Sequence, residues 1–329
     1  MRGKHRVIVK NNRLHYEFEI KRNISIIKGD SATGKTTLID MIRQAQTLGS
    51  ASGIELSCDA PCRVLEGNDW KLILENTKGH IIFIDEENSF INTEEFAKAV
   101  EHSDNYFVLI TRESLYNLPY SVEEIYGLKS SGKYQNTSRI YQSMYQIYSA
   151  KNEMPVVPNR IVTEDSKSGY QFFKQVCDEN NIACESAEGK SKIYKYLKDN
   201  RDSVETCVVA DGAAFGPEME KVYGLVMRNQ NMKLYLPESF EWVILKSGII
   251  DGNTVKDILD HPEDFIESQE YFSWERYFEK LLIDNTIGSY MQYTKTKLPE
   301  AYLHEKNKEA ILAVIADGKM KIDKKYMIR

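Results

Sequence analysis

The spacing of hydrophobic residues near the amino terminus predicts a β-hairpin, a buried strand and a helix. Hydrophobic and polar residues alternate across residues 6–20, interrupted at Asn11 and Asn12, as the strands of a half-buried hairpin require. Residues 24–29 begin with a short apolar run typical of a buried strand, and residues 36–46 have the length and apolar spacing of an α-helix. The loop between this strand and helix therefore lies where a parallel α/β sheet can hold a ligand.

Similar patterns continue the α/β order through the first half of the chain. Residues 50–78 are expected to form short strands, most clearly at residues 70–75, WKLILE. Two apolar runs that end in polar residues, 80–88 and 105–114, flank a helical pattern at residues 93–103. A strand, helix, strand unit is therefore predicted.

A tyrosine-rich stretch follows, SRIYQSMYQIY at residues 138–148. Tyr141, Tyr145 and Tyr148 are four and three positions apart. That spacing is typical of the packing face of a helix, and a base-stacking surface is the alternative. We therefore expect a helix here.

A domain boundary is predicted near residue 152. Residues 148–160 carry two prolines and little periodicity, and a new strand is expected directly after them. Beyond the boundary, strands and helices alternate again as a second, smaller α/β unit, and from about residue 238 the pattern is mostly helical. The predicted fold class is therefore α/β, with a first domain at 1–151, a second domain at 152–235 and its helical extension at 236–329. The elements expected in the second domain are strand 160–164, helix 170–180, strand 182–186, helix 190–199 and strand 206–211.

The composition is that of an ordinary soluble protein. The chain has 329 residues, more than one compact core usually holds, and its net charge of -6 with 28% charged residues gives no overall attraction to nucleic acid. The five cysteines are scattered, and neither a signal peptide nor a long apolar span is present, so we expect a cytoplasmic protein that does not bind membranes. Cys58 and Cys62 have the spacing of half a zinc site, but no second Cys or His pair follows nearby, so ordinary thiols are expected.

The chemistry of the first domain centres on residues 29–36, GDSATGKT. Two glycines let this backbone curl so that its N–H groups point at phosphate oxygens, and the spacing is that of a phosphate-binding loop. Lys35 is expected to bridge the terminal phosphates, and the Thr36 hydroxyl is expected to hold Mg²⁺. ATP and Mg²⁺ are therefore the expected cofactors. The residues expected to contact them are Gly29, Asp30, Ser31, Ala32, Thr33, Gly34, Lys35, Thr36 and Thr37.

Acidic residues follow the strand predicted at residues 80–85. Asp85 is expected at the tip of that strand, across the sheet from the loop, where it would complete the Mg²⁺ ligands. Together with Glu86 it resembles the Walker B motif of ATPases, and the resemblance implies that Glu86 polarises the attacking water. A solvated acidic strand end is the alternative. By the same resemblance Thr111 or Arg112 would sense the γ-phosphate, and an ordinary surface arginine fits as well.

The first domain resembles a shortened member of the transporter-type and chromosome-maintenance ATPases, because a hairpin leads into the phosphate-binding loop. Those ATPases carry a signature loop between the two Walker motifs. The faintly similar LKSSGKYQ, residues 128–135, follows Asp85 instead and is interpreted as a turn. The resemblance implies that a neighbouring molecule completes the site, so a homo-oligomer or a partner subunit is expected.

Three stretches of the second domain, RIVTEDSKSG, CESAEGKSKIYKYL and CVVADGAAFG, resemble the Toprim fold of topoisomerases, primases and overcoming-lysogenization nucleases. The resemblance implies Glu164 as general acid or base and Asp211 as a metal ligand for phosphodiester cleavage. Asp165 replaces a glycine of the family and Ala213 replaces an aspartate, so Asp165 or Glu218 would have to supply the missing ligand. Acids at strand ends are common in α/β domains, and a purely structural role for Glu164 and Asp211 is the alternative.

Basic residues suggest nucleic acid as a partner of the second domain. Residues 190–201 carry five lysines and arginines whose spacing on a helix could follow a phosphate backbone, with a solvated helix face as the alternative. The basic residues 319–329 are interpreted as a tail rather than as a nucleic-acid arm.

Together these features predict a bacterial or mobile-element defence protein in which ATP turnover controls a Toprim-like effector, a metal-dependent nuclease. The stretch LPESFEWVIL, residues 236–245, resembles the segment after Toprim cores in some bacterial anti-phage proteins that pair such a domain with an ATPase. An ATP-gated scaffold with a catalytically silent second domain is the first alternative. A phosphate-loop kinase is the second, although the Asp85–Glu86 pair and the lack of a recognisable arginine-rich lid argue against it.

Overall fold

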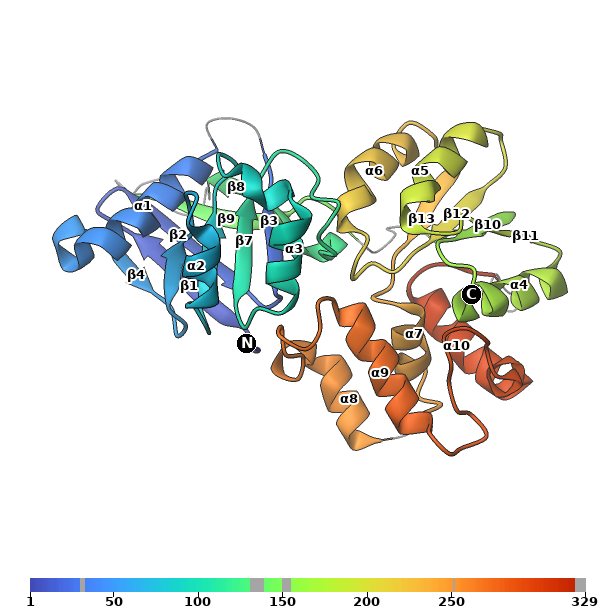
Figure 1. Ribbon diagram of the computed structural model, residues 1–329. Coiled ribbons are helices and arrows are strands. Elements are labelled where there is room, and N and C mark those ends of the chain that lie inside the picture. Colours follow the sequence, from blue (N-terminus) through green and yellow to red (C-terminus); the bar gives the residue numbers. More distant parts are fainter. Residues whose placement is uncertain (30–32, 131–138, 150–154, 251, 323–329) are drawn as a thin grey trace. The chain divides into compact units, whose positions relative to one another are not determined.

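The chain is divided into two units. A computed structural model describes residues 1–29, 33–130, 139–149, 155–250 and 252–322. The first unit comprises Met1–Tyr148 and His261–Ser273, and the second comprises Ser149–Asp260 and Trp274–Arg329 (Figure 1). Residues 261–273, which were expected within the helical extension, therefore belong with the first unit.

A large mixed sheet forms the centre of the first unit. In the described residues, the five strands at one side of the sheet are parallel, and the other four form a wing with mainly antiparallel pairing. In sheet order the strands are β4 (Glu55–Ser57), β1 (His5–Lys10), β2 (Leu14–Ile20), β9 (Ile140–Gln146), β8 (Ile125–Ser130), β3 (Ile24–Ile27), β7 (Tyr106–Ile110), β6 (Ile81–Ile84) and β5 (Cys62–Val64). The parallel half is expected to present its functional residues at the carboxyl ends of its strands.

The amino-terminal hairpin packs against α1 (Lys35–Leu48), and both predicted elements are present. Within the hairpin, Val7 of β1 pairs with Phe18 of β2, and both side chains are buried. Leu38 and Ile42 of α1 are fully buried in the same core. The alternation of the hairpin and the four-residue spacing of the helix thus face each other, which is why the local patterns identified these elements correctly.

One predicted strand is wrong. Residues 70–75 form helix α2 (Trp70–Glu75) instead of a strand. Trp70 and Leu74, four positions apart, are each 6% exposed, whereas Leu72 between them is 65% exposed. This is helical periodicity in a run too short for the pattern to be decisive, and packing selects the helix, because Trp70 stacks on Phe90 with ring centroids 4.9 Å apart.

One predicted helix is also wrong. The tyrosine-rich stretch forms strand β9, which pairs in parallel with β2 and antiparallel with β8. Tyr141 lies opposite His15, and Tyr145 lies opposite Gly127, whose missing side chain leaves room for the tyrosine ring. Most side chains of β9 are at least partly exposed, so burial imposes no clear period, and pairing with strands far away in the sequence decides the conformation. A turn was also predicted at residues 128–135, but residues 128–130 form the end of strand β8, and residues 131–135 lie outside the described residues.

Among the described residues, the remaining helices of the first unit are α3 (Glu94–Glu101), as predicted, and the short 3-10 helices η1 (Gly49–Ser52), η2 (Ser89–Asn92), η3 (Val122–Glu124) and η6 (Pro262–Asp264). Thr93 caps α3 by accepting a hydrogen bond from the Phe96 N–H.

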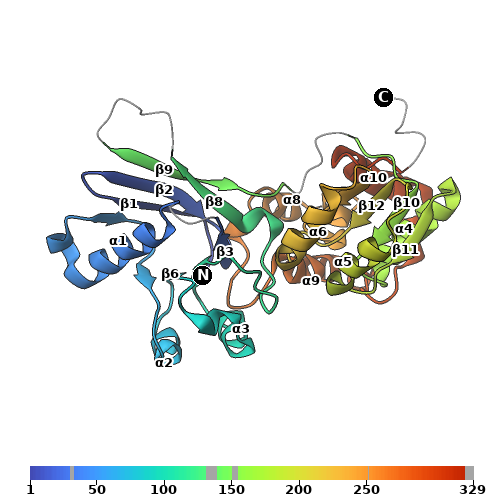
Figure 2. The same cartoon turned by 90° about the horizontal axis from the view of Figure 1, so that it is seen from above.

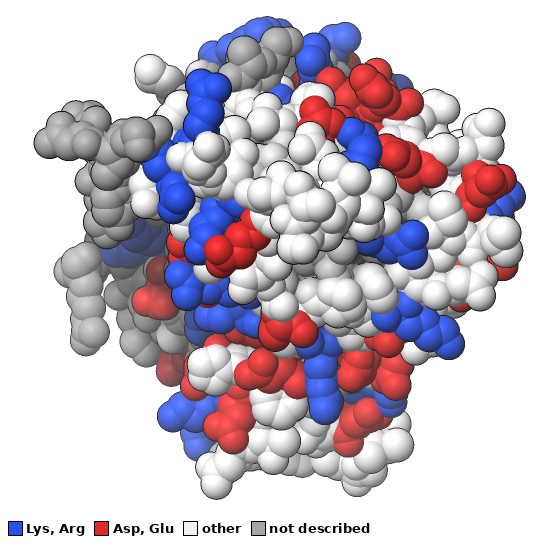
Figure 3. Space-filling view, turned by 90° about the vertical axis from the view of Figure 1, so that its left-hand side faces the viewer, with Lys and Arg blue, Asp and Glu red and all other residues white. Residues whose placement is uncertain are grey.

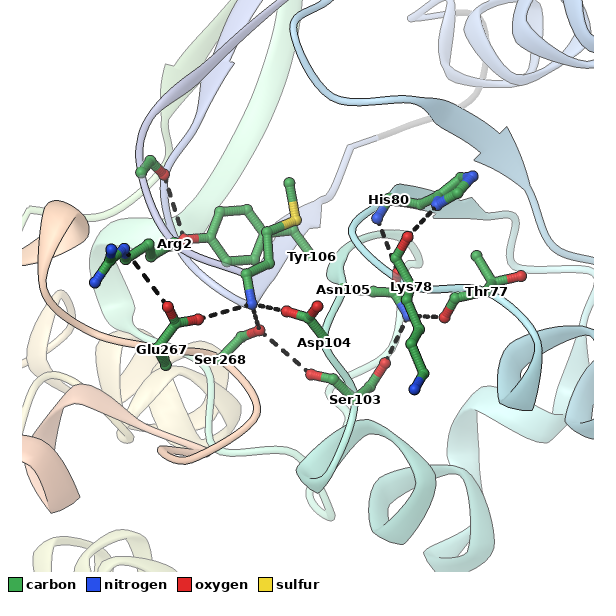
Figure 4. A network of polar contacts seen from close by, with 12 residues as sticks. Arg2, Thr77, Lys78, His80, Ser103, Asp104, Asn105, Tyr106, Glu267 and Ser268 are labelled. Atoms are coloured by element: carbon green, nitrogen blue, oxygen red, sulfur yellow. Dashed lines mark hydrogen bonds and ion pairs between the residues drawn. The ribbon is translucent and has the colours of Figure 1, made fainter.

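The segment His261–Ser273 is joined to the rest of the first unit by polar contacts of Glu267 and Ser268 (Figure 4). The α-amino group of Met1 donates to Asp104, to Glu267 at 3.0 Å and to the Ser268 hydroxyl at 3.1 Å. In return, the backbone N–H of Ser268 donates to the Met1 carbonyl oxygen at 2.9 Å. Charge-assisted bonds of this kind join two stretches at opposite ends of the unit's sequence.

A parallel sheet forms the centre of the second unit, as the alternation of strands and helices predicts. Its order is β11 (Ala183–Ser186), β10 (Arg160–Thr163), β12 (Thr206–Val209) and β13 (Met232–Tyr235). Figures 1 and 2 show α5 (Lys190–Asp199) and α6 (Met219–Val226) on one face of this sheet and α4 (Ser168–Asn180) on the other. The other helices of this unit are η5 (Gly216–Glu218), α7 (Phe240–Lys246), α8 (Asn253–Asp260), α9 (Trp274–Thr286), η7 (Glu300–Leu303) and α10 (Glu305–Asp317).

Candidate functional site

The phosphate-loop sequence lies between the buried strand β3 and the amino end of α1. Gly34, directly before α1, has a φ of 91°, and Gly29 has a φ of 141°, a backbone range in which glycine is not strained. A Cβ atom at Gly34 would lie 2.9 Å from the Tyr16 hydroxyl oxygen, so this position has no room for a side chain. Three further residues predicted to contact phosphate lie outside the described residues: Asp30, Ser31 and Ala32.

Lys35 is held against the loop that precedes it. Its side chain is 6% exposed, and its Nζ donates to the Gly29 carbonyl oxygen at 2.6 Å and to Thr33 Oγ1 at 3.0 Å. The Tyr16 hydroxyl donates to the Gly34 carbonyl oxygen at 2.9 Å. Burial raises the pKa of Tyr16 to about 12, so the hydroxyl keeps its proton and remains a donor. A side-chain hydrogen bond therefore links the hairpin to the loop.

A cavity of about 330 Å³ opens beside this loop. Because β7 lies between β3 and β6, the carboxyl ends of three adjacent parallel strands meet here. The volume is within the range of small-molecule sites. The structure thus brings together most of the described residues predicted for the first domain. The lining residues are Thr33, Gly34, Lys35, Thr36, Thr37, Asp85, Glu86, Ile110 and Arg112.

Asp85 is the buried acid of this cavity. It is 6% exposed, follows β6 directly, and accepts a 2.7 Å hydrogen bond from the backbone N–H of Glu86. Burial raises the pKa of Asp85, and the Glu86 N–H opposes that shift without cancelling it. The charged carboxylate is therefore held in a place that disfavours it, and a cation in the cavity would relieve that cost.

Glu86 and Arg112 form an ion pair in the cavity wall. Arg112 Nη2 lies 3.2 Å from Glu86 Oε1, and the two side chains are 57% and 33% exposed. Solvent screens such a pair, so it adds little to stability. Thr111 is 3% exposed, and its hydroxyl accepts a 3.0 Å hydrogen bond from the Glu113 N–H. Of the two residues predicted to sense the γ-phosphate, Arg112 is therefore the one that lines the cavity.

In the second unit, Glu164 and Asp211 lie side by side at the carboxyl ends of the adjacent strands β10 and β12. Glu164 Oε2 accepts a 3.1 Å hydrogen bond from the backbone N–H of Asp211. Both line a cavity of about 20 Å³, which is enough for one water molecule or one small ion. The two predicted acids are thus brought together, in a space too small for a phosphodiester group.

Two charged residues that line this cavity were missed by the sequence analysis. Glu241 on α7 is 1% exposed and accepts a 2.7 Å hydrogen bond from the Tyr293 hydroxyl. Lys295 Nζ lies 2.9 Å from Glu275 and 3.2 Å from Glu279, both on α9, and 3.9 Å from Glu241. A glutamate inside the apolar run FEWVIL was an available signal for Glu241, whereas no local pattern marks Lys295.

Burial among like charges raises the pKa values of these acids. Burial is the main cause that raises the pKa of Glu164 to about 7, and the Asp211 N–H opposes it. Burial also raises the pKa of Asp211 well above its usual range, with Glu275 and Glu164 adding to the shift, and raises that of Glu241. For Lys295, burial lowers the pKa, but the charges of Glu241, Glu275 and Asp211 outweigh it, so the net shift is upward. Lys295 therefore stays charged at neutral pH.

The position at which the Toprim resemblance implies a second aspartate is apolar. Ala213 is 2% exposed and offers no ligand atom. Asp165 lines the cavity, but its carboxylate accepts hydrogen bonds from the N–H groups of Lys167 and Tyr170, each at 3.2 Å. Glu218 lies in η5 and is not one of the described residues around the cavity. Therefore neither Asp165 nor Glu218 offers the cavity an open carboxylate in place of the aspartate.

In the described ranges, no group of three or more His, Cys, Asp or Glu side chains is arranged to hold a metal ion. Cys58 and Cys62 both carry free thiols.

The predicted basic helix is α5, but two of its lysines are engaged within the second unit. Lys190 Nζ donates to the Ala214 carbonyl oxygen at 3.1 Å, and Lys192 pairs with Glu188 at 3.0 Å.

On the side of the first unit that carries β4, Figure 3 shows basic and acidic side chains mixed together. That face therefore lacks the single sign of charge that a phosphate backbone would favour.

No protein-family model matches the chain, and no curated protein matches it. Within the part of the chain that the structure describes, no helix has the length and apolar character needed to span a bilayer. Function is therefore inferred from the geometry of the two cavities.

Proposed function

We propose that the first unit binds ATP with Mg²⁺ and hydrolyses it, and that the second unit is a Toprim-like effector controlled by the nucleotide. The cavity beside the loop supports this proposal most strongly, because Lys35, Thr36, Asp85 and Glu86 all line it. These residues supply the charge, the ion ligands and the proton acceptor that hydrolysis of a triphosphate requires.

The residues present fit a bound MgATP. Thr36 and Asp85 offer a hydroxyl and a carboxylate, oxygen ligands that Mg²⁺ prefers, and the ion would neutralise charge on the phosphates. Lys35 can exchange its contacts with Gly29 and Thr33 for phosphate oxygens. The amino end of α1 has neither a side-chain cap nor an acidic residue in its first turn, so its N–H groups are suited to an anion.

Glu86 is the residue that would activate water. One third of its surface is exposed, so water reaches its carboxylate, and it lies directly after the buried Asp85. In the structure it is paired with Arg112. A γ-phosphate would compete for Arg112, and its arrival would leave Glu86 available to accept a proton from water.

The second unit has two candidate roles. The pairing of Glu164 with Asp211 supports a metal-dependent nuclease in bacterial or mobile-element defence, with Glu164 as the group that moves a proton. The small volume of the cavity and the apolar Ala213 favour the second role, an ATP-gated scaffold whose Toprim-like domain is catalytically silent. In both cases a homo-oligomer or a partner subunit would complete the ATPase.

The ATPase is tested with Lys35→Ala and Glu86→Gln. Loss of the ammonium should lower turnover by about a thousandfold, because several kcal/mol of charge stabilisation is removed from the transition state. Glu86→Gln should keep ATP binding and stop turnover, since only the proton acceptor is lost. Lys71→Ala, in an exposed lysine of α2 outside the cavity, is the control. Wild-type turnover in Lys35→Ala would refute the assignment.

The two roles of the second unit are separated by a nicking assay with DNA and RNA in Mg²⁺ or Mn²⁺. A nuclease predicts cleavage by the wild type and none by Glu164→Gln. The scaffold predicts no cleavage with either metal, together with ATP-dependent oligomerisation measured by light scattering. Equal cleavage by wild type and Glu164→Gln would remove the catalytic role of Glu164. A phosphate-transfer screen with labelled ATP tests the kinase alternative.

A further inference from the structure

The acidic cavity of the second unit does not fit a divalent ion as its residues lie. The Toprim resemblance implies such an ion between Glu164 and Asp211. One oxygen of Glu164 is already bonded to the Asp211 N–H, and Ala213 supplies no ligand. Only one position in the cavity wall is basic among the described residues, and it is Lys295. A cationic side chain therefore already lines the cavity in which the resemblance implies a metal.

The backbone around Lys295, residues 293–298, is held in place by hydrogen bonds to α4. The Lys295 carbonyl oxygen accepts a 3.0 Å hydrogen bond from the Ser168 N–H at the start of α4. Gln171 on the same helix binds this segment twice, because it donates to the Thr296 carbonyl oxygen at 3.0 Å and accepts from the Leu298 N–H at 2.8 Å. The ammonium group is thus aimed by fixed backbone rather than by a mobile side chain alone.

The side of the cavity near Glu241 carries an unpaired negative atom. Glu241 Oε1 accepts the Tyr293 hydroxyl and lies 3.9 Å from Lys295, but Glu241 Oε2 is buried and has no hydrogen-bond partner. A buried carboxylate oxygen without a partner is costly, so Glu241 depends on the positive charge of Lys295, which lies 3.9 Å from its other oxygen. The space of about 20 Å³ holds one water molecule or one small ion.

The balance of charge explains why Lys295 matters. Four acids line the cavity, and two more, Glu275 and Glu279, bind the same ammonium group. Removal of the lysine would leave Glu241, Glu275 and Glu279 without the ammonium group that lies beside them, and buried carboxylates then either take up protons or bind another cation. The lining acids are Glu164, Asp165, Asp211 and Glu241.

We propose that Lys295 is the built-in cation of this site, that it takes the place of a divalent metal ion, and that the cavity binds such an ion only when Lys295 is removed or withdrawn. The comparison with a metal site depends on the Toprim-like role proposed for the second unit. Lys295 acts through the carboxylates that it neutralises, so it is a regulatory residue that keeps the cavity free of metal.

The test is Mn²⁺ binding by the full chain, measured by calorimetry and by the shift in Tm. Lys295→Met removes the charge and keeps the length of the side chain. It should bind Mn²⁺ at least about tenfold more tightly than the wild type, because one repelling charge beside the carboxylates is gone. The Tm of the second unit's transition should rise with Mn²⁺ in this variant, whereas in the wild type the same transition should not move. Lys295→Arg keeps the charge and should behave as the wild type.

Glu241→Gln combined with Lys295→Met keeps the test decisive if the single variant is unstable. The double variant lacks both the lysine and one buried carboxylate, so it should fold without metal and lose the gained Mn²⁺ affinity. If Lys295→Met alone is unfolded, recovery of its fold by Mn²⁺ supports the proposal, and failure to recover overturns it. Equal Mn²⁺ affinity of wild type and Lys295→Met also overturns it. A wild type without ATPase activity would refute the function of the first unit and leave this result unchanged, because all the residues involved lie in the second unit.

Discussion

At Gly34 the loop before α1 and the amino-terminal hairpin constrain each other directly. The residue has a φ of 91°, and an added Cβ would lie 2.9 Å from the Tyr16 hydroxyl oxygen and 3.8 Å from the ring atoms Cε1 and Cζ. The same hydroxyl donates to the Gly34 carbonyl oxygen. Gly34→Ala therefore strains the backbone and displaces the hydroxyl, whereas Tyr16→Phe removes the group that would be displaced. The two substitutions should not be independent.

Two contributions to the cost of Gly34→Ala can be separated: the strain of the left-handed backbone and the loss of the hydrogen bond from Tyr16. A left-handed backbone costs a residue other than glycine about 1–2 kcal/mol, and loss of the hydrogen bond adds about 1 kcal/mol, so Gly34→Ala should lower local stability by about 2–3 kcal/mol. Tyr16→Phe should cost about 1 kcal/mol, since only the hydrogen bond is lost. The double variant should cost about 2–3 kcal/mol, about 1 kcal/mol less than the sum, because the bond is lost once and the contacts at 3.8 Å are ordinary.

Hydrogen exchange of the backbone amides at the start of α1 is the suitable measurement, followed by mass spectrometry at increasing urea concentration. It reports the free energy of local opening, whereas a melting curve of the whole chain would mix the transitions of two units. The wild type, both single variants and the double variant form a cycle. An equal cost of Gly34→Ala in the tyrosine and phenylalanine backgrounds would refute the contact between loop and hairpin.

Trp70→Ala should lower the free energy of unfolding of the first unit by about 3–5 kcal/mol, because a buried aromatic ring is lost. Leu72→Ala, on the exposed face of the same helix, should change it by less than about 0.5 kcal/mol. Similar losses for the two variants in urea denaturation would contradict the helical assignment of α2. Arg112→Ala should alter the free energy of unfolding of the first unit by less than about 1 kcal/mol, since its ion pair with Glu86 is exposed, but it should slow ATP turnover. An unchanged turnover number would refute the proposed contact between Arg112 and the nucleotide. The raised pKa of Glu164 means that its carboxyl binds a proton more tightly in the folded protein, so its contribution to the stability of the second unit should be fully present below pH 4.5 and be lost as the pH rises through 7. Glu164→Gln should flatten this fall, measured by hydrogen exchange of the amides of β10 and β12 across pH, and an identical slope would show that Glu164 does not titrate in this range.

The sequence alone determined the elements whose periodicity coincides with their burial. Val7 and Phe18 alternate with polar neighbours and are buried as that pattern predicts, and Leu38 and Ile42 keep the spacing of a helix. The glycine spacing of the loop before α1 also placed Gly34 at a position where a residue without a side chain fits best. Local patterns are reliable here because each element has one buried face and one exposed face.

Tertiary structure decided the elements without such a face. The six residues of α2 are compatible with either conformation, and the stacking of Trp70 on Phe90 selects the helix. In β9 the spacing of Tyr141 and Tyr145 imitates a helix, but the main-chain hydrogen bonds of the segment are made with β2 and β8. Strand pairing depends on partners that lie far away in the sequence, so short-range periodicity does not contain it.

The same division applies to the two cavities. Lys35, Thr36, Asp85 and Glu86 follow motifs whose spacing carries their chemistry, and a parallel sheet brings strand ends together, so their grouping followed from the sequence. The grouping of Glu241 and Lys295 with Glu164 did not, because it depends on how helices late in the chain pack beside the small sheet. Charge compensation in a buried site is a property of three-dimensional neighbours, and only the folded chain shows which lysine meets which carboxylates.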